Sequence, residues 1–144
     1  MKKFQRVIIA LVLSLTTFSS LSADRIGYFS IKSALQRGYN EGIIDRSIPI
    51  YFKGQKRPGY KKNIGTYKSN KKTNAFGKSD EQACQWVFLS AVKSLLNRAK
   101  REGGRAVVDV VSIYKNRKFT SATQFECGIG VFVAGVALRG KVVR

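Results

Sequence analysis

The chain has 144 residues, of which 27 are lysine or arginine and eight are aspartate or glutamate, so its formal net charge is +19. Such an excess attracts anionic surfaces, whether lipid phosphates, nucleic acid or acidic proteins, without distinguishing among them. The sequence contains no histidine, which removes the commonest general base and the commonest metal ligand. We therefore expect a protein that is not an enzyme and that holds neither a metal ion nor a cofactor.

Residues 1–23 have the three regions of a secretory signal peptide. Three positive charges precede an uninterrupted apolar or hydroxyl-bearing stretch, residues 7–18, and small residues then lead to Ala23. We expect cleavage after Ala23, with Ser22 as the alternative. The apolar stretch is shorter than the roughly 20 residues that span a bilayer. We therefore predict no transmembrane segment after cleavage, and a location in the periplasm or outside the cell.

Residues 24–144 remain after cleavage and suffice for one domain with a single core. They carry 24 basic and eight acidic residues, a net charge of +16. Two cysteines, Cys84 and Cys127, are present. An even count in an exported chain predicts a disulfide, whereas the alternative, a reactive or metal-binding pair, lacks CxxC spacing.

The first part of this domain mixes short apolar runs with turn residues. Residues 25–29 predict a strand, and residues 30–36 predict a short helix that ends at Gly38. Residues 48–52 are β-branched and aromatic around one proline, which predicts a second strand, at a sheet edge or with the proline near its start.

Residues 53–78 form a basic segment with nine lysines and arginines and no acid. Neither helical nor strand periodicity persists, so we predict a long loop, with a short hairpin around Ile64–Gly65 as one option. A loop of this length in a compact domain is either functional or partly disordered.

Aromatic residues are interleaved with these cations, at Tyr60, Tyr67 and Phe76. Such a pattern would let cations contact phosphates while rings stack on a ligand. The other interpretation is a solvated loop whose charge aids solubility. The candidate anion-binding residues are Lys53, Lys56, Arg57, Lys61, Lys62, Lys68, Lys71 and Lys72.

The best organised element is a long helix after Ser79. The sequence Ser-Asp-Glu-Gln forms a capping box at its start, apolar residues recur at helical spacing as far as Ala99, and Gly103–Gly104 ends it. Trp86 lies beside the apolar stripe, so we expect a core residue there rather than a platform for a ligand.

Three β-rich stretches follow, at residues 106–114, 121–133 and 136–143. The polar turn at 115–118 predicts an antiparallel hairpin between the first two, and strand alternation divides 106–114 between two faces. Glycines between residues 128 and 135 indicate bulges or close backbone approach.

A bond between Cys84 and Cys127 would place the helix against this sheet. We therefore predict an α+β fold, a single domain in which one long helix packs on a mostly antiparallel sheet and one disulfide joins them.

The acidic residues suggest no catalytic pair. Asp109 and Glu126 are expected either to face each other across the hairpin or to pair with Arg105 or Arg117. A serine nucleophile would have no histidine partner, although a serine–lysine pair is an arrangement that residue counts leave open.

Several motifs resemble a family of small secreted bacterial proteins whose members carry the name "excinuclease ATPase subunit". The name implies a nucleotide-binding repair enzyme, but the required GxxxxGK[ST] loop is absent, because Gly77–Lys78–Ser79 lacks the first glycine. The resemblance implies no activity and no functional residue. The motifs that carry it are Asn70–Glu81, Ala83–Trp86, Ala106–Val108, Ser121–Thr123 leading to Glu126–Cys127, and Ala134–Leu138.

A fainter likeness concerns architecture. The order of a helix, a glycine turn into Ala106–Val108, and strands that end in Gly135–Leu138 is similar to the C-terminal part of YbjQ-like domains and of the Rcs envelope-stress sensor lipoprotein. This likeness implies a fold and no more.

The sequence thus favours an exported, non-enzymatic binding protein that contacts an anionic envelope component, lipid or nucleic acid through the basic segment. The alternative is an envelope-stress or assembly factor that acts through protein–protein contacts. A small hydrolase with an unrecognised site is a third class.

Overall fold

A computed structural model describes residues 25–144, and the predicted signal peptide lies outside the described residues. Two helices pack on a mixed six-stranded sheet, which confirms the predicted α+β class and single domain. The elements in chain order are β1 (Arg25–Ser30), α1 (Ile31–Asn40), β2 (Ile50–Phe52), β3 (Asn63–Asn74), α2 (Asp80–Arg101), β4 (Ala106–Ser112), the 3-10 turn η1 (Tyr114–Asn116), β5 (Gln124–Ile129) and β6 (Val133–Val143).

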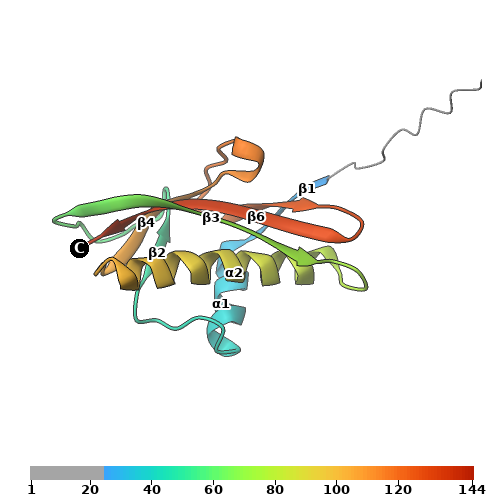
Figure 1. Ribbon diagram of the computed structural model, residues 1–144, viewed down its shortest axis with the longest axis horizontal. Coiled ribbons are helices and arrows are strands. Elements are labelled where there is room, and N and C mark those ends of the chain that lie inside the picture. The colour runs from blue at the N-terminus through green and yellow to red at the C-terminus, as the bar shows by residue number, and fades with distance from the viewer. Residues whose placement is uncertain (1–24) are drawn as a thin grey trace, which may run out of the picture.

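Strand β6 is the centre of the sheet (Figure 1). Its first residues pair with β5 and its later residues pair with β4, so β5 and β4 lie one after the other along the same side of β6. Strand β3 pairs antiparallel along the other edge for nearly the full length of β6. Beyond these strands, β1 pairs antiparallel with β5, and β2 pairs parallel with β4.

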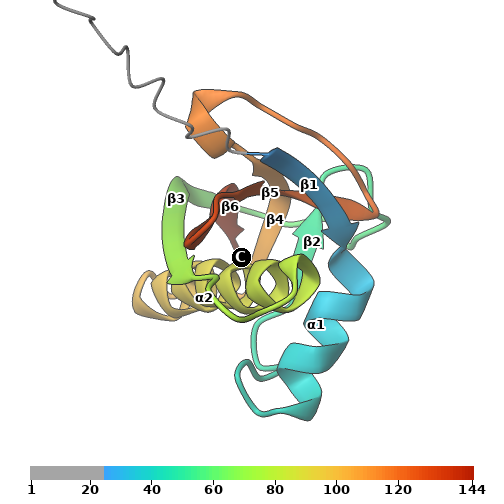
Figure 2. The same ribbon diagram turned by 90° about the vertical axis from the view of Figure 1, so that its right-hand side faces the viewer.

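Helix α2 covers one face of the sheet, which we call the inner face, and α1 packs beside it (Figures 1 and 2). Phe88 of α2 stacks on Phe125 of β5 with 4.0 Å between ring centroids, and both side chains are fully buried. Cys84 of α2 and Cys127 of β5 form the predicted disulfide beside this pair. The longest helix is therefore joined covalently to the sheet that it covers.

A serine side chain caps the first turn of each α-helix. Ser79 Oγ accepts from the Gln82 amide at 3.2 Å and Gln82 Oε1 accepts from the Ser79 amide at 3.3 Å, which confirms the capping box. Ser30 Oγ caps α1 in the same way, accepting from the Ser33 amide. Gly103, at φ +70°, turns the chain after α2, a conformation that glycine adopts without steric cost.

The prediction of a loop over residues 53–78 is wrong, because residues 63–74 form β3. The strand lies at an edge of the sheet and carries polar residues on both faces, so it lacks the hydrophobic alternation of a half-buried strand. Ser69 is its only fully buried residue among those described. Edge strands in natural proteins commonly carry lysines, which oppose pairing with other chains.

The predicted hairpin between residues 106–114 and 121–133 is also wrong. Strand β4 pairs with β2 and β6, whereas β5 pairs with β1 and β6. The cause lies partly in Asp109, whose φ of +51° places a bulge in β4 and shifts its register against β6. The bulge also breaks the predicted alternation, so that Val107 and Val110 both enter the core under α2.

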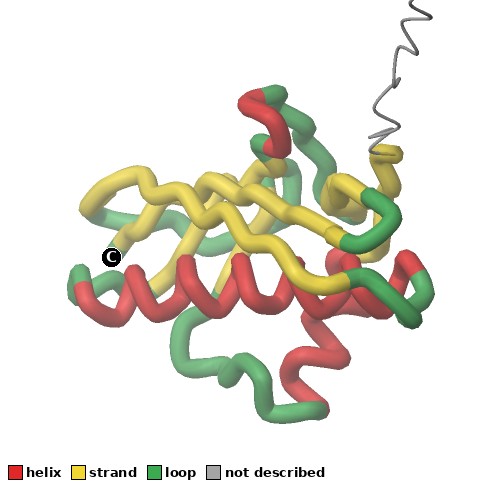
Figure 3. Tube along the Cα trace, turned by 45° about the vertical axis from the view of Figure 1, so that its right-hand side comes forward, coloured by secondary structure: helices red, strands yellow, loops and turns green. Residues whose placement is uncertain are grey.

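The connection from β4 to β5 crosses the outer face of the sheet, opposite α2 (Figure 3). Tyr114 of this connection lies directly over two glycines. A Cβ atom on Gly128 would lie 2.0 Å from the Tyr114 ring, and one on Gly135 would lie 3.3 Å from it. These glycines thus permit the close approach that the sequence indicated.

Candidate functional site

The structure divides the candidate anion-binding residues among several places instead of one loop. An extended strand rises about 3.3 Å per residue, so the span from Asn63 to Lys71 separates the two ends of the basic segment by about 26 Å. Lys61 and Lys62 lie beyond one end of β3, whereas Lys71 and Lys72 lie towards the other.

Lys61 and Lys62 form part of a small basic hollow near the C-terminal residue. Their amides donate to the Arg144 carbonyl at 2.9 and 2.7 Å, and Arg105 completes the lining together with Gly103. Three residues of this hollow, Gly103, Arg105 and Arg144, lie outside the predicted segment.

Three other candidates lie near β2 and β4, and one of them is already paired. Arg57 donates to Asp109 Oδ1 at 3.4 Å, and Lys141 donates to Asp109 Oδ2 at 3.3 Å. The sequence predicted that Asp109 would face Glu126 or pair with Arg105 or Arg117, and neither arrangement is present among residues 25–144. Lys53 and Lys56 are exposed.

Lys68 points to the outer face, because it lies opposite Arg139 in the register of β3 and β6. Neither residue has an ion-pair partner within residues 25–144. They place two further cations on that face of the sheet.

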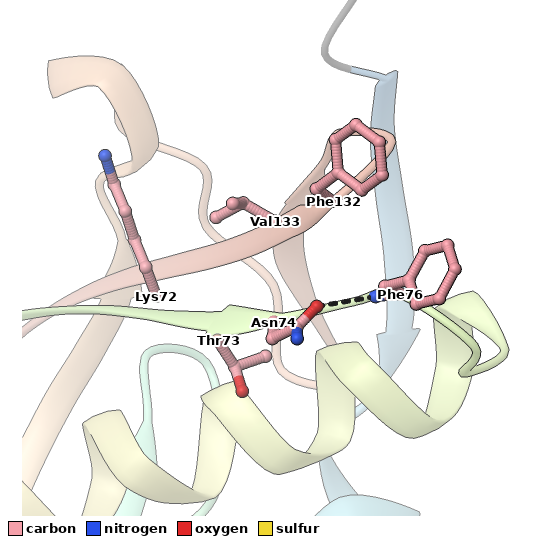
Figure 4. A pocket seen from close by; sticks show the side chains of 6 residues that line it. All are labelled: Lys72, Thr73, Asn74, Phe76, Phe132 and Val133. Atoms are coloured by element: carbon pink, nitrogen blue, oxygen red, sulfur yellow. Dashed lines mark hydrogen bonds between the residues drawn. The ribbon is translucent and has the colours of Figure 1, made fainter.

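A second group of cations lines a hollow between β3 and α2, which we call the β3–α2 groove. Its volume is about 430 Å³. Lys71 enters it from the strand, and Lys93 and Arg101 enter it from the helix. Lys72 also borders the groove, but its side chain points to the outer face of the sheet, away from α2 (Figure 4). The remaining lining residues are hydrogen-bonding side chains, namely Ser90, Ser94 and Asn97.

The helical side of the groove follows from the period of α2. Residues 90, 93, 94, 97 and 101 are separated by intervals of three and four, so they share one face of the helix. The opposite face, which includes Phe88, Val92 and Leu95, is buried against the sheet. Burial of the apolar stripe therefore sets the direction in which the groove residues point.

The cations of the groove are free of acidic partners. Among residues 25–144, no ion pair joins Lys71, Lys72, Lys93 or Arg101 to a carboxylate, and no acid lines the groove. Neighbouring helix cations differ, since Arg98 pairs with Glu102 at 2.8 Å and Lys100 with Asp45 at 3.1 Å. The groove thus concentrates uncompensated positive charge from two elements that are separate in sequence.

Trp86 contradicts the expectation of a core residue, because it is 46 % exposed. It precedes Ser90, Lys93 and Asn97 at intervals of four and three residues, so it belongs to the stripe that continues into the groove. Sequence reasoning missed this because apolar residues lie on both of its flanks. The intervals to Lys93 and Asn97 were the signal that could have placed it correctly.

Glu126 is a buried acid away from the groove. Its side chain lies beneath the β4–β5 connection, and among the described residues its Oε1 atom has no hydrogen-bond partner. Burial raises the pKa of Glu126, and the charge of Arg117 opposes that rise. Arg117 is thus the one expected partner that acts on this carboxyl group.

A second hollow lies at the end of the sheet where β3 and the β5–β6 turn meet (Figure 4). It is lined by Lys72, Thr73, Asn74, Phe76, Phe132 and Val133. The rings of Phe76 and Phe132 lie 6.0 Å apart between centroids. The Lys72 side chain points to the same side of the sheet as Val133 (Figure 4), so its positive charge belongs to this hollow rather than to the β3–α2 groove.

The fold and the groove define a small disulfide-linked α+β protein with a basic groove between a helix and an edge strand. Comparison with protein-family models, with curated proteins and with solved structures found no match. The family resemblance of the sequence motifs therefore remains a prediction. Neither helix of residues 25–144 is long and apolar enough to cross a membrane.

Proposed function

We propose that this protein is an exported, non-enzymatic binding protein that holds an anionic envelope component in the β3–α2 groove. The observation that carries the proposal is the convergence of Lys71, Lys93 and Arg101, without an acidic partner among the described residues, in one hollow. Like charges at close range repel, so the arrangement costs free energy unless an anion compensates it.

The chemistry of the lining favours phosphate or carboxylate groups. Lysine ammonium groups act as mobile point charges, while the arginine guanidinium group binds oxyanions through two parallel hydrogen bonds. Ser94 and Asn97 add neutral donors from the same helical face. The groove lies open to solvent along its length, which suits a chain or a surface carrying several anionic groups.

The proposal of a binding protein rather than an enzyme is supported by the absence of histidine from the sequence. Ser90, the groove serine closest to Trp86, donates its hydroxyl to the Trp86 carbonyl at 3.2 Å. That hydroxyl is therefore held by the helix backbone, which does not favour a nucleophilic role.

Export rests on the first 23 residues and on the disulfide, which suits an oxidising compartment. Together they suggest the periplasm or the exterior of the cell, where anionic lipids and polymers are abundant ligands for a cationic protein.

Titration with inorganic polyphosphate tests the proposal, because Trp86 is the only tryptophan in the chain and adjoins the groove. We expect a saturable change in its emission, and we expect the affinity to fall steeply as salt rises. Absence of binding to polyphosphate at low salt, with salt-insensitive capture of one envelope protein, would favour the assembly-factor alternative instead.

A further inference from the structure

One end of the molecule presents apolar side chains directly to solvent. The exposed fractions are 70 % for Phe76, 76 % for Val131, 62 % for Phe132 and 47 % for Val133. We call these four residues the apolar tip. They come from two loops, one between β3 and α2 and one between β5 and β6, that lie at the same end of the sheet (Figure 1).

The tip is held in place by backbone hydrogen bonds. The Ala75 amide donates to the Phe132 carbonyl at 2.8 Å and so joins the two loops. The Phe76 amide donates to Asn74 Oδ1 at 2.8 Å, and the Gly130 amide donates to the Val133 carbonyl at 2.8 Å. A preformed tip loses little conformational entropy when it binds a partner.

Positive charges flank the tip. Lys72 lines the hollow beside Phe132, and Lys78 donates to the Asn74 carbonyl at 2.9 Å. Of the two acids that follow in the first turn of α2, Asp80 pairs with Arg25 at 2.9 Å, whereas Glu81 accepts a hydrogen bond from the neutral amide of Gln85 at 3.3 Å and keeps its charge. The two loops themselves, residues 75–79 and 130–133, contain no acid.

We propose that the apolar tip inserts into the interfacial region of an anionic lipid bilayer while the neighbouring lysines contact lipid phosphates. This proposal rests on the proposed anion binding and names its ligand as the phosphate groups of a lipid surface. Figure 4 shows Phe76 and Phe132 at the ends of their strands, with Lys72 farther along β3.

Two observations favour a bilayer over other occupants. Interfacial binding combines buried apolar area with attraction to anionic headgroups, and each lysine near such a surface contributes about 1 kcal/mol. Lys72 lines the hollow beside Phe132, and Lys78 lies in the same loop as Phe76, so one approach to a membrane brings both the aromatic rings and these two cations to the lipid.

The test compares sedimentation of the purified protein with vesicles of phosphatidylcholine alone and with vesicles that also contain phosphatidylglycerol. The tip variant is Phe76→Ser with Phe132→Ser, and Tyr60→Ser serves as the matched control, because Tyr60 is an exposed aromatic residue before the opposite end of β3. We expect binding only to anionic vesicles. We expect the tip variant to bind at least about ten-fold more weakly, since two exposed phenylalanines lose their burial, and Tyr60→Ser to bind normally.

Insertion itself is measured with Phe132→Trp in a Trp86→Phe background. Emission should shift to shorter wavelength and be quenched by brominated lipids when anionic vesicles are added. Unchanged melting temperatures of all variants would show that the fold is intact.

The outcomes separate this proposal from the proposed function. If polyphosphate binds but the tip variant binds anionic vesicles normally, anion binding stands and tip insertion is wrong. Failure of both polyphosphate and vesicles to bind overturns both proposals. Loss of a dimer in the tip variant, without vesicle binding by the unaltered protein, assigns the tip to a second copy of the chain and overturns insertion.

Discussion

Removing the three groove cations should reduce both affinity for a polyanion and its dependence on salt. The variant combines Lys71→Gln, Lys93→Gln and Arg101→Gln, all at exposed positions where glutamine preserves most of the side-chain length. Because none of the three pairs with an acid within residues 25–144, the substitutions break no internal ion pair. The fold should therefore survive.

The magnitude follows from counterion release. Each phosphate of a single strand that the protein neutralises contributes about 0.7 to the slope of log affinity against log salt concentration. Three contacts thus contribute about 2.1, so a fourfold rise in salt, from about 50 to about 200 mM, weakens the groove's share of binding about 20-fold. The triple variant should lose that share of the slope.

The assay is fluorescence anisotropy of a labelled single-stranded oligonucleotide, used as a generic phosphate polymer, across a salt series. A matched control replaces three other exposed lysines by glutamine, namely Lys32, Lys53 and Lys118. The control has the same net charge but an intact groove, so its slope should stay close to that of the unaltered protein. Equal losses in the two variants would refute the reasoning, because attraction would then depend on total charge and not on the groove.

Further predictions concern stability and export. Replacing Cys84 and Cys127 together by alanine should destabilise the fold by about 4 kcal/mol on the chain-entropy model for a 43-residue separation, and an unchanged urea midpoint would contradict this. Glu126→Gln should raise stability at neutral pH by about 1 kcal/mol, because it removes a buried, unpaired carboxylate. Burial raises the pKa of Glu126 in the folded state. The folded protein is therefore favoured while the group is protonated, and it loses stability as pH rises through the folded pKa. The stability gained by Glu126→Gln should accordingly vanish below the unfolded pKa, and a gain that persists in acid would show that the charge is not its cause. Gly128→Ala should cost about 1–3 kcal/mol, because its Cβ would overlap the Tyr114 ring, and the melting temperature measures this. N-terminal sequencing of the exported protein should begin at Asp24 or Ala23, whereas a product that retains Met1 would contradict export.

The sequence predicted the parts of the fold whose signals are local. The capping box at Ser79, the repeat of apolar residues and the terminal glycines all belong to α2 itself, and the structure confirms each of them. The disulfide could also be predicted, because two cysteines allow only one pairing.

Strand β3 was missed because its environment is not encoded in its own pattern. An edge strand buries little, and here the inward positions include Tyr67, Ser69, Lys71 and Thr73, which do not form an apolar stripe. Its residues pair with residues of β6 that lie 59 to 80 positions away in the sequence. The predicted pairing of β4 was wrong for a different reason, since nothing in the sequence marks a positive φ at Asp109.

Only part of the candidate site could be predicted, because the groove is formed by residues that are distant in the sequence. The run of positive charge in the sequence indicated Lys71 and Lys72 as candidates, whereas nothing in the sequence linked the cations of α2 to them. Packing of α2 beside β3 brings Lys93 and Arg101 to Lys71, while Lys72 points to the outer face (Figure 4) and Lys61 and Lys62 lie beyond the far end of the strand. Only a tertiary contact joins the two halves of the groove.

The most direct test of an anion-binding groove is to map a bound polyanion on amide resonances. Titration of isotopically labelled protein with inorganic polyphosphate at low salt should shift the amides of Lys71, Lys93, Ser94 and Asn97 first, at the lowest ligand ratios. Shifts spread evenly over the exposed lysines, with Lys32 and Lys118 moving as early as Lys93, would contradict the groove as the binding site.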